Sequence, residues 1–319
     1  MGTYIVRRLL LMIPTIVLVG VCTFSLLRLV PGDTITAQIL STGQPGVQYD
    51  HAKVAQMKKQ LGLSGSIPSQ FWNWVSDMAR GDFQKSFVTN KDSLSEFGSR
   101  LGPTVELGIL AVLFSALIGL PIGILSAVYQ DSPIDLIGRL IAILALAIPN
   151  FAIALLVVVF GAREFKYAFP TGSHPFFSDP SGNVQQFFIP AAVIALGSAG
   201  VLMRLTRTSM LDVLRQDFIR TAKAKGIRPM MVIHRHALKN ALMPVVTIIG
   251  AQLSAVIAGA VIIESIFNIR GVGLQTLTAV NQRDYPQVQT NVLIFALILL
   301  VGNLLTDLAY GLLDPRIRY

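Results

Sequence analysis

Long apolar stretches divide the sequence and leave few folds open to it. A helix that crosses the hydrocarbon core of a bilayer needs roughly 17–25 predominantly apolar residues. Backbone groups in lipid must be hydrogen-bonded within the protein, and none of the stretches alternates like a barrel strand. The sequence therefore predicts an all-α integral membrane protein with six transmembrane helices. The stretches run approximately over residues 9–30, 104–129, 134–160, 187–203, 241–267 and 288–313, of which the fourth is the shortest.

The composition agrees with a bilayer environment. Hydrophobic residues make up 53% of the chain and charged residues 13%, whereas a typical soluble domain is about 25% charged. The net charge of +9 is compatible with nucleic-acid binding, but the basic residues cluster in loops between apolar stretches, which argues against that partner. The single cysteine, Cys22, lies in the first stretch, so a disulfide framework is excluded and a thiolate metal site is disfavoured.

The first apolar stretch has two interpretations, a membrane anchor and a cleaved signal peptide. It is longer than the usual signal-peptide core, and no Ala-x-Ala-like site follows it. The sequence Pro31-Gly32-Asp33 after it is typical of a helix stop. We therefore expect a retained anchor, with Arg7-Arg8 as a cytoplasmic flank rather than an export signal.

The basic residues predict the orientation, because positively charged loops tend to stay in the cytoplasm. The N-terminal segment holds Arg7 and Arg8, and the C-terminal tail holds Arg316 and Arg318. These segments and the loop between the fourth and fifth stretches share one side only if the number of spans is even. We expect six spans with both termini in the cytoplasm (N-in/C-in). The basic residues of that loop are Arg204, Arg207, Arg215, Arg220, Lys223, Lys225, Arg228, Arg235 and Lys239.

Three parts follow from this topology: residues 1–30 with the first span, an external loop over 31–102, and a core over 103–319. The external loop holds Trp72, Trp74 and a helical-looking run over residues 50–61. It has two readings of equal weight. One is a docking surface for an external partner, and the other is a solvated loop that covers the mouth of a pore.

The cytoplasmic segment 206–240 has apolar residues at helical spacing on both sides of Gly226. We expect two short amphipathic helices joined by a glycine turn. A basic amphipathic stretch is typical of a segment that lies on anionic lipid, but it also suits a plug that fits a cleft on a cytosolic partner. The residues themselves do not separate these readings. The apolar positions are Leu211, Leu214, Phe218 and Ala222, then Ile227, Met231 and Leu238.

An ordered set of short motifs extends over nearly the whole chain. The strongest block is Asp217–Gly226, followed by His236–Ala241 and Pro244. The others are Tyr4–Leu9, Ile13–Thr15, Leu29–Asp33, Gly81–Phe83 with Ser86, Pro103–Gly108, Ile148–Phe151, Glu264–Phe267, Gly271–Gly273, Arg283–Pro286, Asp307–Tyr310 and Asp314–Arg318. Together they resemble the inner-membrane permeases of ATP-binding-cassette (ABC) importers, specifically the dipeptide and oligopeptide branch. One departure is Asn268–Arg270, where the family often has Ser-Trp-Pro.

The resemblance implies a role for the segment of about 211–239. It looks like the coupling loop that the family seats in its ATPase subunits, with Arg220-Thr221-Ala222 in the place of the wider superfamily's Glu-Ala-Ala and Gly226 at the expected offset. The ATPase-coupling residues implied in this way are Asp217, Arg220, Thr221, Ala222, Lys225 and Gly226. The motif Ile148–Phe151 resembles the family's proline break in the third span.

Catalytic motifs are absent from the sequence. There is no G-x-x-x-x-G-K-[ST] loop, H-E-x-x-H or G-x-S-x-G, so we expect no enzymatic activity and no resident cofactor or metal. ATP and Mg²⁺ are expected on partner subunits. His234 and His236 form H-x-H, but Arg235 between them repels a cation, so a pair of ordinary loop residues is the favoured reading.

Ionisable residues within or beside spans are candidates for function. Glu106 and Glu264 lie near the outer ends of the second and fifth spans, and Asp307 lies inside the inner end of the sixth. Each of these three residues can be interpreted as a pathway or gate residue or as a packing contact. For Asp307 the packing contact is the favoured interpretation. Gly119 and Gly123 flank Pro121 at a spacing typical of close helix contact.

The predicted function is that of a permease subunit of an ABC importer for dipeptides or oligopeptides, working by alternating access in a bacterial cytoplasmic membrane. Its implied partners are a second homologous permease, two P-loop ATPases and an external substrate-binding protein. The same architecture also suits import of a nickel chelate, glutathione, haem or an oligosaccharide. An ATP-independent secondary transporter is disfavoured, because the sequence has no inverted repeat.

Overall fold

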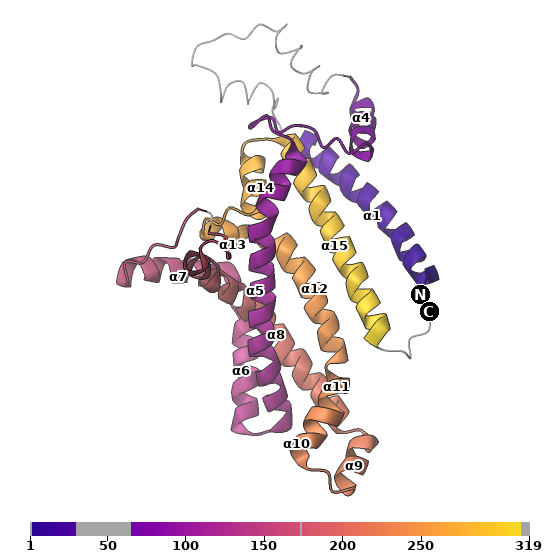
Figure 1. Ribbon diagram of the computed structural model, residues 1–319, viewed down its shortest axis with the longest axis vertical. Coiled ribbons are helices and arrows are strands. Elements are labelled where there is room, and N and C mark those ends of the chain that lie inside the picture. The colour runs from indigo at the N-terminus through magenta and orange to yellow at the C-terminus, as the bar shows by residue number, and fades with distance from the viewer. Residues whose placement is uncertain (1, 30–64, 173, 314–319) are drawn as a thin grey trace. The chain divides into compact units, whose positions relative to one another are not determined.

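The computed structural model describes residues 2–29, 65–172 and 174–313, so the expected helix over 50–61 lies outside the described residues. Within the described residues the regular elements are helices joined by turns and loops, and no strand forms beyond two isolated bridges, which confirms the all-α prediction (Figure 1). The elements in order are α1 (Gly2–Leu29), α4 (Ile67–Ala79), α5 (Ser93–Val128), α6 (Pro133–Ala147), α7 (Asn150–Glu164), α8 (Pro180–Leu214), α9 (Asp217–Ala224), α10 (Pro229–Met231), η1 (Val232–Ala237), α11 (Leu238–Ala241), α12 (Met243–Gly259), α13 (Val261–Ile266), α14 (Val272–Asn281) and α15 (Tyr285–Leu313).

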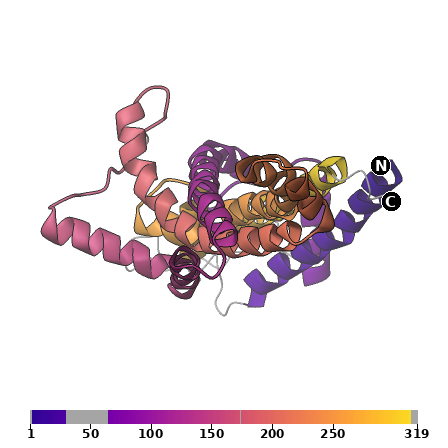
Figure 2. The same ribbon diagram turned by 90° about the horizontal axis from the view of Figure 1, so that it is seen from below.

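The candidate membrane spans agree with the apolar stretches. Among the described residues, 5 helical segments are long and apolar enough to cross a bilayer, and the count reaches 6 when α6 and α7 are taken as one bent span. These two helices meet at 88° (Figure 2). The break lies at Pro149, where Ile148 is extended with φ −93° and ψ 120°, because a residue before proline is disfavoured in the helical region. The motif at 148–151 therefore marks the break.

Two spans are longer than their apolar stretches predict. Helix α5 begins at Ser93 rather than near residue 104, and the Asp92 side chain accepts a hydrogen bond from the Ser95 N–H at its start (2.7 Å). Its 36 residues span about 54 Å, well beyond a hydrocarbon core of about 30 Å. Helix α8 begins after Asp179, which accepts from the Gly182 N–H. A hydropathy profile detects only the apolar part of such a helix, and the residues that cap the helix lie outside that part.

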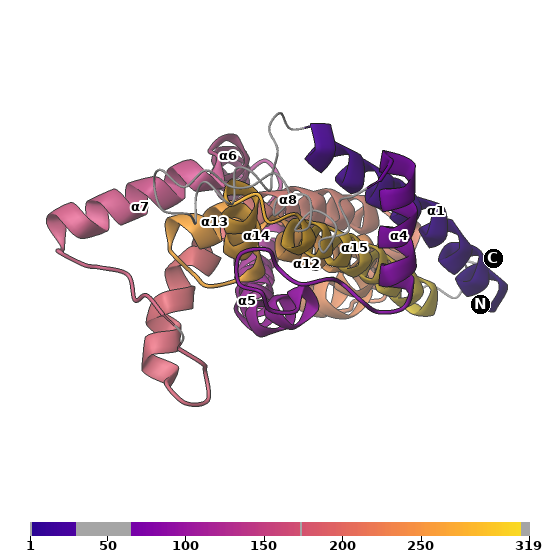
Figure 3. The same cartoon turned by 90° about the horizontal axis from the view of Figure 1, so that it is seen from above.

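The chain divides into two compact units. The first comprises residues up to 101 together with 275–297, and the second comprises 102–274 together with 298–319. In the first unit, Trp74 of α4 packs with Phe24 of α1 and Leu293 of α15, whereas Trp72 is 71% exposed. Figure 3 shows α4 lying beside α1. The described part of the external loop is therefore packed against helices at Trp74. Its role as a docking surface stays a prediction.

In the second unit, α5 and α8 make close backbone contact. A Cβ atom at Gly119 would lie 2.8 Å from the Leu202 Cβ atom, and one at Gly123 would lie 2.7 Å from the Thr206 Cβ atom and 2.8 Å from the Met203 carbonyl oxygen. Atoms do not approach so closely, so each glycine permits the contact. The predicted small-residue contact on α5 is confirmed, and its partner is α8.

Replacing Gly123 with alanine is expected to destabilise the protein by about 1–3 kcal/mol, because the added methyl group meets backbone that cannot shift alone. Gly98 lies in the same helix, and a Cβ atom there would have nothing within 4 Å of it. Since alanine is the better helix former by about 1 kcal/mol, Gly98→Ala should keep or raise the melting temperature of the purified protein in detergent. Equal melting temperatures for the two variants would contradict the packing argument.

Candidate functional site

The segment after α8 folds into two helical parts that meet at Gly226. Gly226 has φ +74°, a left-handed conformation that favours glycine. Its N–H donates to the Lys223 carbonyl (3.0 Å), and the Ile227 N–H donates to the Ala222 carbonyl (3.4 Å). This pair of hydrogen bonds is a Schellman motif, which ends α9 and turns the chain toward α10. The predicted glycine turn is confirmed.

A small hydrophobic core fixes this segment to the ends of α5 and α8. The segment contributes buried side chains from α9, η1 and α11, and the long helices contribute theirs from the adjoining turns. Because the core is continuous across these elements, α9 to α11 form a packed body rather than a loose loop. We call this body the coupling element. Its buried residues are Ile219, Ala222, Val232, Ala237 and Ala241, and those of α5 and α8 are Ala127, Met210 and Val213.

The apolar positions of the coupling element do not all lie on one buried face. The Phe218 and Met231 side chains are 40% and 51% exposed, and Met230 is 68% exposed. The chain leaves the helical path at Arg215 and Gln216 between α8 and α9, so the helical phase restarts there. Three large apolar side chains are therefore presented outward.

The residues implied for ATPase coupling divide into two groups. Asp217, Arg220, Thr221 and Lys225 are exposed, as is Gly226, whereas Ala222 is buried in the core of the element. Arg220 and Asp217 form an ion pair of 3.4 Å, and both side chains are largely in solvent, where such a pair contributes little. Their contact with an ATPase stays a prediction.

Glu264 of α13 is fully buried beside the start of α14. Its Oε1 atom accepts a hydrogen bond from the Thr104 hydroxyl (2.6 Å), and its Oε2 atom accepts from the Leu274 N–H (2.8 Å). The Thr104 hydroxyl oxygen in turn accepts from the Val272 N–H (2.9 Å). A Cβ atom at Gly271 would overlap the Glu264 carboxylate. Glu264 therefore joins α5, α13 and the first turn of α14.

Glu106 of α5 contacts the first turn of α8. The Asn183 side-chain amide donates to Glu106 Oε1 (2.7 Å) and to the His174 carbonyl (2.8 Å). His174 also contacts Asp179 (2.8 Å), and the Gly182 N–H together with His174 holds the pKa of the Asp179 carboxyl below its ordinary value. Glu106 thus forms a hydrogen bond between α5 and α8, while its role as a gate stays a prediction.

Asp307 is half-buried on α15, within an apolar stretch. A role for Asp307 on the pathway likewise stays a prediction. The described residues contain no group of three or more His, Cys, Asp or Glu side chains that is arranged to hold a metal ion.

A hollow of about 350 Å³, which we call the polar hollow after three polar side chains in its mostly apolar lining, lies beside the break between α6 and α7. Asn150, Ser198 and Gln252 line it among apolar residues, and the Gln252 Nε2 atom donates to the Ser198 carbonyl (3.2 Å). Gln252 Oε1 has no hydrogen-bond partner within the described chain. This hollow was not predicted from the sequence, although a glutamine inside an otherwise apolar stretch was a signal for it.

Asp135 was also missed, although it is an acidic residue at the start of an apolar stretch. It is fully buried and accepts two hydrogen bonds from Arg207, from Nε and Nη2, each of 2.7 Å. Such a bidentate pair fixes both distance and direction. It requires the start of α6 and the final turns of α8 to lie at the same end of the helices, which is the arrangement that the predicted topology needs.

Comparison with known protein families identifies the family of this chain. Residues 119–319 match the model described as the inner membrane component of binding-protein-dependent transport systems, and residues 1–98 match the model of the N-terminal part of such a membrane component. The chain belongs to this family. It is a multi-pass permease of an ABC importer in the inner membrane.

The permease is similar over its full length to curated relatives. It is 36% identical over 339 residues to the dipeptide transport system permease protein DppB of Alkalihalophilus pseudofirmus. It is 35% identical to the probable peptide ABC transporter permease protein y4tP of Sinorhizobium fredii and 34% identical to the glutathione transport system permease protein GsiC of Pectobacterium atrosepticum, both over 319 residues. Each comparison covers 100% of both chains.

Solved structures of ABC transporters share the fold. A chain of the MetNI methionine ABC transporter in an inward-facing conformation has a TM-score of 0.55 at 17% identity, covering 69% of the permease and 96% of that chain. A chain of an amino acid ABC transporter has a TM-score of 0.51 at 18% identity, covering 70% of the permease and 95% of that chain.

Proposed function

We propose that this permease imports small peptides and that the coupling element docks on a cytosolic ATPase. The observation that carries the proposal is the coupling element itself. It is packed onto α5 and α8 by its own core and presents Phe218, Met230 and Met231 outward beside exposed basic residues. Large apolar side chains exposed on a rigid body are typical of an interaction site.

The mechanism follows from this rigidity. A packed body moves with the helices to which it is attached, so an ATPase that pulls on α9 displaces the inner ends of α5 and α8. Two ATPases that close on ATP would move the elements of this permease and of a second homologous permease together. The pair then alternates between inward-open and outward-open states. ATP, Mg²⁺ and hydrolysis belong to the ATPases, and the orientation that places the coupling element inside is N-in/C-in.

The substrate class rests on the relatives and on the polar hollow. The relatives are named for the transport of dipeptides, peptides or glutathione, which are all peptides or peptide-like molecules. Side chains such as Asn150 and Gln252 offer both donors and acceptors, which suit a peptide backbone passing through an apolar surrounding. An external binding protein delivers the peptide and provides much of the selection.

Reconstituted uptake tests the proposal. The permease, co-expressed with its neighbouring transport genes, is purified and placed in liposomes with a labelled dipeptide, a labelled oligopeptide, glutathione or a nickel chelate. We expect uptake of at least one peptide that needs both ATP and the binding protein. Uptake without ATP, or of the chelate alone, would contradict the proposal.

A variant locates the docking site in the same preparation. Phe218→Glu places a charge on the proposed interface, and we expect at least a tenfold loss of co-purified ATPase, because a buried interfacial aromatic is worth about 2 kcal/mol or more. The matched control is Phe177→Glu, since Phe177 is 97% exposed and lies outside the coupling element. Equal ATPase recovery from the two variants would exclude Phe218 from the interface.

A further inference from the structure

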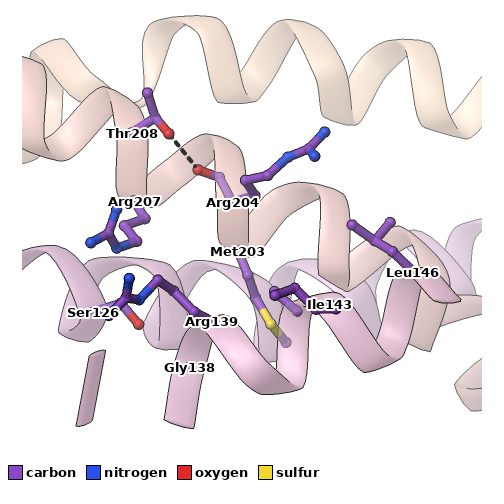
Figure 4. Close-up of a pocket in the computed structure, with 10 residues that line it drawn as sticks. Ser126, Gly138, Arg139, Ile143, Leu146, Met203, Arg204, Arg207 and Thr208 are labelled. Carbon is purple, nitrogen blue, oxygen red and sulfur yellow. Dashed lines mark hydrogen bonds between the residues drawn. The ribbon is translucent and has the colours of Figure 1, made fainter. Parts of the chain in front are cut away.

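The ion pair of Asp135 and Arg207 joins three parts of the second unit. Arg207 donates from Nε and Nη2 to the fully buried Asp135 carboxylate. Asp135 Oδ2 also accepts a hydrogen bond from the Asp131 N–H (3.1 Å), in the turn between α5 and α6. In the pocket between α6 and α8 that Figure 4 shows, Arg139 and Arg207 point to the same side, whereas Arg204 points away from both. The Asp135 carboxylate therefore connects α6, α8 and the turn after α5.

The geometry of this pair suits positioning better than stabilisation. The Arg207 side chain is 20% exposed, and Arg139 Nε lies 3.6 Å from the same carboxylate. Removing two charges from water offsets much of their attraction, so a buried ion pair is weak evidence for added stability. Two parallel hydrogen bonds, in contrast, fix both the distance and the direction between the groups that they join. The pair therefore sets the register of α6 on α8.

Arg207 lies where α8 enters the core of the coupling element. Met210, whose side chain is buried in that core, follows Arg207 by three residues. Three residues of helix correspond to about 4.5 Å. A displacement of the coupling element therefore acts on Arg207 within one turn of α8, and through Arg207 it acts on Asp135 at the start of α6.

Helices α6 and α8 stay in contact beyond the ion pair. A Cβ atom at Gly200 of α8 would lie 2.9 Å from the Ala142 carbonyl oxygen of α6, so the two backbones touch there. Seven residues separate Asp135 from Ala142, and seven separate Gly200 from Arg207. Both intervals correspond to about 10 Å. The ion pair and the glycine contact are thus in register on two antiparallel helices.

The far end of this helix pair reaches the polar hollow. A Cβ atom at Gly197 of α8 would lie 2.8 Å from Asn150 Oδ1, so Asn150 at the start of α7 is seated on α8. Asn150 lines the hollow together with Gln252 of α12, whose Nε2 atom donates to the Ser198 carbonyl (3.2 Å). Helices α6 and α8 therefore extend from the coupling element to one wall of the hollow.

We propose that Asp135 and Arg207 are positioning residues for transport. They make α6 follow α8 when the coupling element moves, so that the wall of the hollow at Asn150 moves against α12. Apolar packing resists the separation of α6 from α8 but allows them to slide, whereas the two parallel hydrogen bonds resist both movements. The inference rests on the proposed function, because a cytosolic ATPase must move the coupling element.

An apolar replacement of the pair separates positioning from stability. Replacing a buried ion pair with apolar side chains often keeps or raises stability, so Asp135→Leu/Arg207→Met should retain the melting temperature of the purified permease. In proteoliposomes with its co-expressed partners, we expect peptide uptake per ATP hydrolysed to fall about tenfold, the factor that corresponds to losing one charge-assisted hydrogen bond. A pair that acts only in packing would leave uptake per ATP unchanged.

A cysteine in the hollow reports the movement itself. Phe151 lines the hollow and is 47% exposed, so Phe151→Cys in a Cys22→Ser background is a target for a water-soluble maleimide. We expect ATP to change its rate of modification, and Asp135→Leu/Arg207→Met to abolish that change. The reporter protein must first import peptide, so failure of the proposed function appears in this parent and failure of the present inference appears only in the variants.

A second variant and a control complete the test. Arg207→Lys leaves no buried charge unpaired, but lysine cannot form two parallel hydrogen bonds, so uptake per ATP should fall here too, by a smaller factor. Arg163→Met/Glu164→Leu removes an ion pair of 3.2 Å whose side chains are 81% and 55% exposed, and it should match the parent. Parental uptake per ATP in both Asp135–Arg207 variants, or a parental maleimide response in either, would overturn the inference.

Discussion

Glu264→Ala is expected to lower the free energy of unfolding by about 3–5 kcal/mol. The substitution removes the carboxylate that accepts from the buried Thr104 hydroxyl and from the part-buried Leu274 N–H, and a buried group that loses its acceptor costs about 1–3 kcal/mol. It also leaves a cavity where the carboxylate met Gly271. Thermal melting of the purified permease measures the effect, and a large drop in membrane-inserted protein should accompany it.

The matched control for this substitution is Glu164→Ala. The Glu164 side chain is 55% exposed and pairs only with the exposed Arg163 in the part of the chain described here, so its removal should change the melting temperature little. Melting temperatures that fall equally, or not at all, for the two variants would show that the buried network of Glu264 does not hold this part of the fold.

A conservative substitution separates the two readings of Glu264. Glu264→Gln keeps an acceptor oxygen in place and should recover part of the lost stability. If the residue acts only in packing, this variant should also transport. A stable Glu264→Gln protein that binds its partners but fails to import would instead assign a functional role to the carboxylate on the pathway or its gate.

Gly226→Val is expected to reduce ATP-driven uptake at least tenfold while the ATPase activity of the complex persists. Valine at φ +74° costs about 1–2 kcal/mol or more, since a β-branched side chain disfavours the left-handed region. The chain escapes the strain by losing the Schellman hydrogen bonds, which separates α9 from α10 and loosens the coupling element. Uptake and ATP hydrolysis would be measured in the same proteoliposomes.

Two further variants make this prediction specific. Gly226→Asn should retain most of the uptake, because asparagine tolerates the left-handed conformation and nothing lies within 4 Å of a Cβ atom there. Gly81 has φ +85° and equally open surroundings, so Gly81→Val introduces similar strain outside the coupling element and should leave hydrolysis coupled to uptake. Uptake by Gly226→Val at the level of Gly81→Val would contradict the role of the turn.

The sequence was sufficient for features that depend on local chemistry. Apolar length identified the spans, Pro149 marked the break between α6 and α7, and Gly226 marked the turn of the coupling element. The spacing of Gly119 and Gly123 predicted a close helix contact, and the structure supplied its partner, α8. Each of these features is set by a few neighbouring residues, so one sequence is enough to find it.

Features that join distant parts of the chain were out of reach. The partners of Glu264 include Thr104, which is 160 positions away along the chain, and no local pattern predicts which hydroxyl meets which carboxylate. Helical spacing placed Phe218 in line with Leu211 and Leu214, but the chain changes direction at Arg215 and Gln216, so the sequence did not show which of these side chains would be exposed. The polar hollow needed Asn150 and Gln252 to be brought together by tertiary packing.

The length of α5 has a mechanical consequence. Thr104 holds Glu264 about three turns after the first residue of this helix, and Ala127 packs on the coupling element in its last turn, so about 35 Å of continuous backbone separates the two attachments. Pro121 removes one backbone hydrogen bond between them and leaves a soft point in that rod. Gly119 and Gly123, on either side of this point, hold α5 in close contact with α8. A displacement applied where Ala127 contacts the coupling element should therefore reach Thr104 only when α5 and α8 move together as one rigid body.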